Sequence, residues 1–351
     1  MQKSILALAV LGAFAGAASA QSSVTLYGRV GTNITYSTPG DNVNNGDSVW
    51  RMDEGGSSTG MAGSRWGLRG TEDLGGGLRA YFVLESGFNA DDGSGVAGFS
   101  RGAYVALGSK SLGDLRLGRQ ETISRVMNVV YTDVTGLGEF KIDEGQGRAM
   151  FQSFGQRQNN VVQYLTPNFG GFQVAAQVGA GEGANARYQG LMASYNAGPL
   201  KVAAAYEAYD GFGARSSAFN KTFHIGGNYN FGVATLFAGY QDVTDVGSNN
   251  GAAIGATAVR DQQLYNVGVM VPVGAALQLR AQYTNADYDL NDGTSADQQK
   301  YGISVRYLLS KRTTLYSAIT QRDGEGPGGV DDSRGFAQER AVTLLGVDHI
   351  F

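Results

Sequence analysis

The stretch from residue 64 to residue 88 reads SRWGLRGTEDLGGGLRAYFVLESGF. Trp66 and Leu68 share one parity, and Arg65 and Arg69 share the other. A strand that is apolar on one face and charged on the other separates two environments. The glycine-rich reversal EDLGG then joins this strand to a second alternating run, as in a hairpin.

The same alternation continues along most of the chain, and two kinds of connection interrupt it. Short turns are expected at 72–76, 109–113, 167–171, 196–199, 230–232, 272–274 and 310–312. Longer polar loops are expected at about 37–60, 86–99, 120–156, 179–187, 208–220, 241–262, 285–299 and 322–338. Seven hairpins with a first and a last strand predict a 16-stranded antiparallel transmembrane β-barrel. Short turns on the periplasmic side and long extracellular loops are typical of such a barrel, which has no free sheet edge.

The first twenty residues predict a cleaved signal peptide. Lys3 supplies the positive charge, residues 4–16 are apolar, and residues 18–20 read Ala-Ser-Ala, a signal-peptidase pattern. A short membrane anchor is the less favoured alternative, because the apolar run is too short to span a bilayer. We therefore expect residues 21–351 to form the barrel.

Composition excludes several classes of protein. After residue 20 no apolar stretch reaches the length of a membrane-spanning helix. Removing Lys3 changes the net charge from −4 to −5, whereas nucleic-acid-binding proteins are strongly basic. The chain has no cysteine, and neither His224 nor His349 lies in a metal-ligand or G-x-S-x-G spacing. We expect no enzyme activity, no cofactor and no metal site.

The end of the chain predicts export to an outer membrane. Phe351 is terminal, and Leu345, Val347 and His349 share its parity in an alternating strand. Such an aromatic end is a signal for the outer-membrane assembly machinery. Many Tyr and Phe residues adjoin the expected turns, as in the aromatic girdles that contact membrane interfaces. We expect contacts with outer-membrane lipid and lipopolysaccharide.

The chain resembles the general porins of Gram-negative bacteria, of the β-proteobacterial and neisserial type. The matching runs include SSVTLYGRV at 22–30, RGAYVALGS at 101–109, GDLRLGRQ at 113–120 and LSKRTTLYSAI at 309–319. The resemblance implies a homotrimer and a third loop that folds into the barrel. Asp348 stands where the family usually has arginine, which reverses one charge near the periplasmic mouth. Loop 3 is also more acidic than in the strongly anion-selective members.

The resemblance implies a water-filled pore for passive diffusion of ions and small hydrophilic solutes. Charged side chains at the narrowest point would set its selectivity. The alternatives are a substrate-specific channel, for example for organic acids, a structural or adhesin barrel, and an outer-membrane enzyme. The sequence does not decide whether such a pore prefers anions or cations.

The expected constriction combines loop 3, about 120–156, with a basic wall. The loop's charged candidates are Glu139, Lys141, Asp143, Glu144 and Arg148. The resemblance identifies Arg65 and Arg101 as constriction arginines, and both are assigned to the lumenal parity. Arg29, Arg69 and Arg116 are predicted to extend the wall. Arg119 and Arg157 flank loop 3, either in the constriction or in an ion-pair network that anchors the loop. A solvated extracellular position of loop 3 is the alternative.

Overall fold

The computed structural model describes residues 23–38, 48–53, 63–95, 98–134, 156–180, 187–210, 219–244, 259–324, 326–327, 336–337 and 340–351. Among these residues, no helix is both long enough and apolar enough to cross a membrane. Most of them lie in one antiparallel sheet of 17 strands. The expected signal peptide lies outside the described residues.

Almost all of the described elements are strands. They are β1 (Ser23–Ser37), β2 (Val49–Asp53), β3 (Arg65–Gly75), β4 (Leu78–Gly87), β5 (Gly102–Ser109), β6 (Gly113–Glu121), β7 (Arg157–Leu165), β8 (Phe172–Gly179), β9 (Arg187–Ala197), β10 (Leu200–Asp210), β11 (Phe219–Asn230), β12 (Thr235–Thr244), β13 (Val259–Val273), β14 (Leu277–Leu290), β15 (Ser295–Leu308), β16 (Thr313–Gly324) and β19 (Arg340–Ile350). A separate pair consists of β17 (Gly326–Pro327) and β18 (Phe336–Ala337). Between β6 and β7 lie the helix α2 (Ile123–Met127) and the π-helix η2 (Asn128–Thr132).

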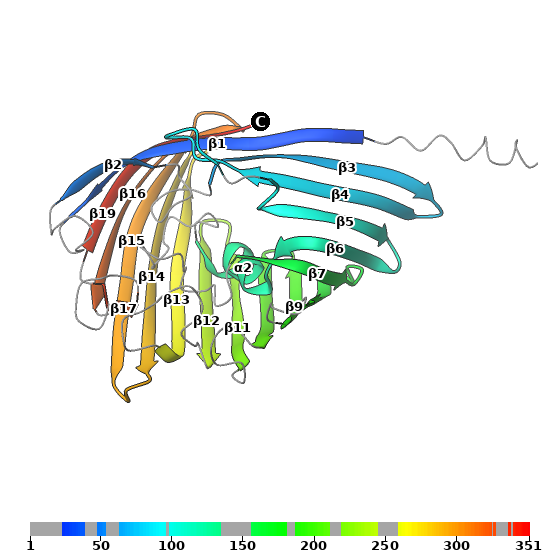
Figure 1. Cartoon of the computed structure of the whole chain (residues 1–351). Coiled ribbons are helices and arrows are strands. Elements are labelled where there is room, and N and C mark those ends of the chain that lie inside the picture. The colour runs from blue at the N-terminus through cyan, green and yellow to red at the C-terminus, as the bar shows by residue number, and fades with distance from the viewer. Residues whose placement is uncertain are drawn as a thin grey trace, which may run out of the picture.

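The sheet closes on itself into a barrel (Figure 1). Each strand from β3 to β16 pairs with the next one along the chain. β16 pairs with β19, β19 with β1, and β1 with β3, which completes the ring. The short β2 lies beside the second half of β1, and the other 16 strands of the 17-stranded sheet form the wall. The expected 16-stranded antiparallel barrel is confirmed.

All seven expected short turns join neighbouring strands. The loop expected at 285–299 is wrong, because β14 runs to Leu290 and β15 begins at Ser295. The cause is alternation: inward-facing Tyr288 and Leu290 are buried, while polar residues such as Asp289 occupy the other parity. The polar residues of this segment therefore occupy one face of a strand and do not indicate a loop. β2 likewise lies within the loop expected at 37–60.

The register sorts side chains between the two faces of the wall. On β5, Val105 and Leu107 are more than half exposed on the outer face, whereas Ala106 is buried on the inner face. The same parity places Glu85 of β4 and Arg116 of β6 inside. An apolar outer face with charges inside is the arrangement that the alternating sequence predicts.

A buried ion pair joins the first strand to the last. Arg29 Nη2 donates to Asp348 Oδ2 at 2.7 Å, and Nε lies 2.7 Å from Oδ1. The two side chains are 7% and 2% exposed. The reversed charge at Asp348 is therefore matched by Arg29 across the seam of the barrel. Because each charge has its counter-charge, Arg29 adds little net charge to the lumen.

The terminal residue closes the outer face of the same seam. Gly28 and Phe351 exchange backbone hydrogen bonds, each with an N–O distance of 3.1 Å. The Phe351 ring occupies the space that a side chain at residue 28 would fill, with Cε2 2.8 Å from the position of such a Cβ. The seam between β1 and β19 is therefore held from both faces.

We predict that Asp348→Asn destabilises the barrel by about 3–5 kcal/mol, because it leaves a buried guanidinium without a counter-charge. Urea unfolding of the detergent-solubilised protein measures this loss. The double variant Arg29→Met with Asp348→Leu removes both charges and should lose much less. An equal loss in the two variants would contradict an electrostatic role.

Candidate pore constriction

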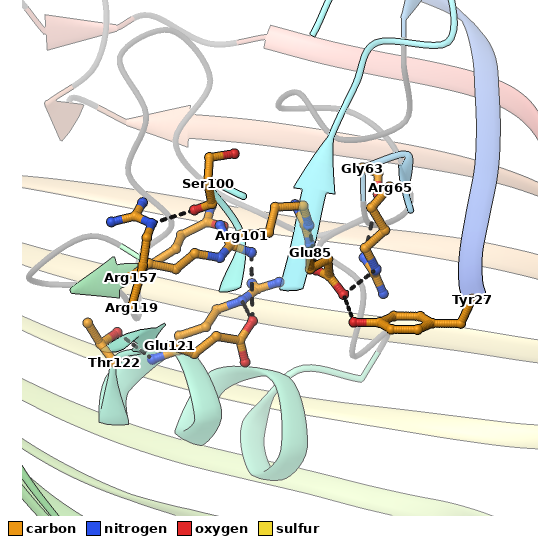
Figure 2. A network of polar contacts seen from close by, with 12 residues as sticks. Tyr27, Gly63, Arg65, Glu85, Ser100, Arg101, Arg119, Glu121, Thr122 and Arg157 are labelled. Carbon is orange, nitrogen blue, oxygen red and sulfur yellow. Dashed lines mark hydrogen bonds and ion pairs between the residues drawn. The ribbon is translucent and has the colours of Figure 1, made fainter. Parts of the chain in front are cut away.

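A charged cluster centred on Glu85 lies on the inner wall of β3 and β4 (Figure 2). Arg101 Nε lies 2.8 Å from Glu85 Oε1, and Arg65 Nε lies 3.7 Å from Oε2. The Tyr27 hydroxyl donates to Oε2 at 3.1 Å. One carboxylate therefore holds two guanidinium groups together on the wall. Glu85 was missed among the site residues, although it shares the parity of Arg79 and Tyr81 in its strand.

The side chain of Arg101 reaches this cluster from a position just before β5, and not from the inner face of that strand as expected. In the register of β5 it shares the parity of Ala103 and Val105, which face outward, so the predicted lumenal parity is wrong. Arg101 lies before the first residue of the strand, at a bend of the chain. The bend turns its side chain inward to Glu85.

A second charged cluster forms where loop 3 leaves and rejoins the wall. Glu121 ends β6, and its Oε1 lies 3.8 Å from Arg125 Nε and 3.7 Å from Arg157 Nη2. Burial lowers the pKa of the Arg125 guanidinium, although arginine still stays protonated at neutral pH. Arg157 thus belongs to an ion-pair network at the base of the loop, and it is not among the residues that line the cavity described next (Figure 2).

A cavity of about 360 Å³ lies between the two clusters. Its charged lining residues are Arg65, Arg101, Arg116, Arg125, Glu85 and Glu121. Four positive and two negative charges leave a net charge of +2. Val126 and Val129 of loop 3 also line this cavity, so the described part of the loop lies inside the barrel and faces the wall. Figure 1 shows α2 within the ring of strands.

Three further arginines were predicted to belong to this wall or to flank loop 3. Arg116 lies in the cavity, where Nε donates to the Tyr81 hydroxyl at 2.9 Å. Arg69 lies outside it, with its guanidinium carbon 5.2 Å from the centre of the Tyr27 ring. Arg119 is on the outward parity and donates to Ser100 O and Asn159 Oδ1, both at 2.5 Å. The sequence placed these three arginines at or beside the constriction, whereas only Arg116 of the three lines the cavity.

Five predicted residues of loop 3 cannot be placed. Glu139, Lys141, Asp143, Glu144 and Arg148 lie outside the described residues. The opposed acidic side of the constriction that they would form stays a prediction. Within the described part of the loop, residues 122–134, the charged side chains are Arg125 and Asp133.

The far wall, which here consists of β8, β9 and β10 on the other side of loop 3, anchors the loop through a buried polar cluster that the sequence did not reveal. Glu207 accepts a hydrogen bond from the Ser124 hydroxyl and lies 2.5 Å from the Tyr188 hydroxyl oxygen. The Ile123 amide donates to that hydroxyl oxygen at 3.1 Å, and Gln177 Nε2 donates to Glu121 O at 3.0 Å. The signal was an acidic side chain on the lumenal parity of β10, an otherwise alanine-rich strand.

A second basic group lies on the other side of the barrel and was also missed. Its members are Arg280 on β14, Lys300 and Arg306 on β15, and Arg322 on β16. The register places all of them on the inner parity, and each is at most 9% exposed. Their inward parity follows from the alternation of polar and apolar residues along β14, β15 and β16.

The comparisons with known proteins agree with this architecture. A family profile described as Gram-negative porin matches residues 7–327. The chain belongs to the Gram-negative porin family. An outer membrane porin of Bordetella pertussis is 33% identical over 90% of this chain and 93% of its own. Outer membrane porin protein 32 of Delftia acidovorans is 36% identical over 91% and 89%.

A solved structure titled as an anion-selective porin from Comamonas acidovorans also matches this porin. The TM-score is 0.72 and the identity 30%, over 94% of this chain and all of the other. The chain is thus an outer-membrane porin, and the fold and family point to a diffusion channel rather than an enzyme.

We predict that Glu85→Gln increases the preference of the pore for anions. The substitution removes a negative charge and raises the net charge of the cavity from +2 to +3. Reversal potentials across planar bilayers in a salt gradient measure the change. Glu72→Gln removes the same charge on the outward parity of β3 and should leave the potential unchanged. Equal shifts in both variants would contradict a special position of Glu85.

Proposed function

We propose that this porin is a general diffusion pore with a preference for small anions. The supporting observation is the net charge of +2 in the cavity between the arginine wall and loop 3. An anion roughly 7 Å from such a charge gains about 1 kcal/mol in water, or about a fivefold preference. The field is stronger where low-dielectric walls confine it and weaker at high salt.

The relatives support this proposal by their names. The Comamonas acidovorans structure is titled as an anion-selective porin, and a Halomonas relative, 26% identical over 73% of this chain, is named a monosaccharide porin. Both kinds of solute are small and hydrophilic. In this chain Arg65, Arg101 and Arg157 are the candidates for the basic wall, with Arg116 and Arg125 beside them.

A substrate-specific channel for organic acids is the second candidate, and the Glu85 cluster favours it. Two arginines and a tyrosine hydroxyl surround the carboxylate of Glu85. Such charge-assisted contacts would suit the carboxylate of a passing solute equally well. Concentration-dependent block of chloride current by one organic acid would favour specificity, and proportional permeation of many acids would favour a general pore.

The exposed outer face supports a homotrimer. From β7 to β15 it carries many large aromatic side chains, among them Tyr195, Phe223, Tyr265 and Tyr307. On β3–β6 the exposed large apolar side chains are aliphatic, apart from Trp66. Aromatic girdles mark lipid-facing wall. We infer that the aliphatic sector contacts neighbouring copies of this chain. A structural neighbour, OmpT of Vibrio cholerae, is titled as a trimer form.

The lipid and assembly partners belong to the same proposal. The aromatic sector would contact outer-membrane lipid and lipopolysaccharide, because exposed tyrosines suit a membrane interface. Phe351, the candidate assembly signal, would be read by the assembly machinery before its ring packs against Gly28.

We predict that Arg65→Ala combined with Arg101→Ala shifts the reversal potential toward cations, because the net charge of the cavity falls from +2 to zero. The same salt-gradient recording measures it. Lys110→Ala with Lys311→Ala removes equal charge from two exposed turns and serves as the control. A potential that stays at its native value would remove the two arginines from the constriction.

We also predict that Val105→Ser with Leu107→Ser yields monomers, because it removes apolar contacts from the aliphatic sector. The matched pair Ile303→Ser and Val305→Ser changes equivalent outward positions on β15 and should leave trimers intact. Native mass spectrometry in detergent counts the subunits. Trimers in both variants would place the interface elsewhere.

A further inference from the structure

Loop 3 crosses the inner face of the barrel from β9 to β14, opposite the arginine wall. Ile123 lies against β9, Thr132 lies against β11 and β12, and Val134 lies against β13. The cavity lies on the other side of the loop, between α2 and the arginines. The distance between loop 3 and the far wall therefore decides how much room is left for solutes.

At four of the places where the loop touches this wall, the wall residue is glycine. The four contact positions, which we call the glycine row, are Gly190, Gly226, Gly239 and Gly268. A Cβ at residue 190 would lie 2.8 Å from Ile123 Cγ1, and one at residue 239 would lie 2.8 Å from Thr132 Cβ. At residues 226 and 268 a Cβ would overlap Thr132 Cγ2 and Val134 Cγ2.

Three members of the glycine row lie on the neighbouring strands β11, β12 and β13, and Gly190 lies on β9. Gly226 and Gly239 face each other in the register of β11 and β12. Gly239 is opposite Asn266 on β13, and Gly268 is opposite Gln282 on β14. The small residues and amides therefore form a track on the inner face, and loop 3 lies along it.

The amides of this track bind the backbone of the loop. Asn228 Nδ2 donates to Val130 O at 3.1 Å, and Asn266 Nδ2 donates to Thr132 O at 2.5 Å. The Val134 amide donates to Gln282 Oε1 at 3.0 Å. Backbone groups of a loop inside a barrel need partners, and these side chains supply them only at close approach. Contact with glycine and hydrogen bonding to amides thus fix the same distance.

We propose that the glycine row determines the width of the pore. A glycine lets loop 3 lie directly on the wall, so the cavity on the arginine side keeps its full size. A larger residue at any of these positions would push the loop toward Arg65 and Arg101 without changing the charge. Width and ion preference would then be set by opposite walls. The proposal rests on the channel function and not on its anion preference.

Gly268→Ala tests this proposal most directly. The added methyl meets Val134 Cγ2, and non-bonded carbons rest about 3.5–4.0 Å apart, so the loop must move by roughly 1.5 Å. We expect a lower single-channel conductance and an unchanged reversal potential. We also expect stronger exclusion of large neutral solutes in liposome swelling. A native conductance in the folded variant would overturn the proposal.

A second-site change separates loop displacement from damage to the sheet. Val134→Ala removes the methyl that Gly268→Ala would strike, so the double variant should regain the native conductance. A folded double variant that stays narrow would overturn the proposal, because the defect would then lie in the wall itself. Mobility of unheated protein on SDS gels shows whether each variant has closed its barrel.

Val134→Leu enlarges the loop side of the same contact and leaves the sheet unchanged. It should also lower the conductance, and it keeps the test decisive if Gly268→Ala does not assemble. The readouts are distinguishable: conductance reports the glycine row, and reversal potential reports the anion preference. If the unsubstituted pore shows no anion preference but its conductance still changes with these substitutions, only the proposed selectivity is refuted.

Discussion

Closure of the sheet is the constraint on which the rest of the structure depends. A strand in hydrocarbon has no water to bond its backbone, so every amide and carbonyl needs a partner in a neighbouring strand. In this porin the first and last strands supply the final set of partners, from the Arg29–Ile350 pair to the Ser37–Val342 pair. Closure in turn forces strict alternation, because each wall residue faces either the outside or the lumen.

The lumen uses this alternation to concentrate charge. Side chains on the inner parity of a few strands meet at one level, and loop 3 brings Arg125 to face them. Arg29 and Arg65 lie directly opposite each other on β1 and β3, where like charges repel. Asp348 and Glu85 relieve that repulsion, one by neutralising its arginine and the other by holding two arginines together. The wall is a balanced set of charges rather than a ladder of free cations.

The sequence was sufficient to predict the features that depend on the two-residue period of the strands and on the positions of the turns. The strand count, the short turns and the inward position of Arg65 and Arg116 followed from local patterns. Arg101 did not, because a bend before β5 overrides the parity. The far wall was also missed: Glu207 and Gly268 acquire meaning only when loop 3 lies against them. That contact joins segments more than eighty residues apart, a separation that no local pattern encodes.

The seam between β1 and β19 has a consequence for the order of folding. Asp348 and Phe351 belong to the last four residues of the chain, and both contact β1. Without these contacts Arg29 would lack its counter-charge and Gly28 would be uncovered on the opposite face. The ring of strands therefore closes only when Arg29 and Asp348, which are 319 residues apart in the sequence, have come together.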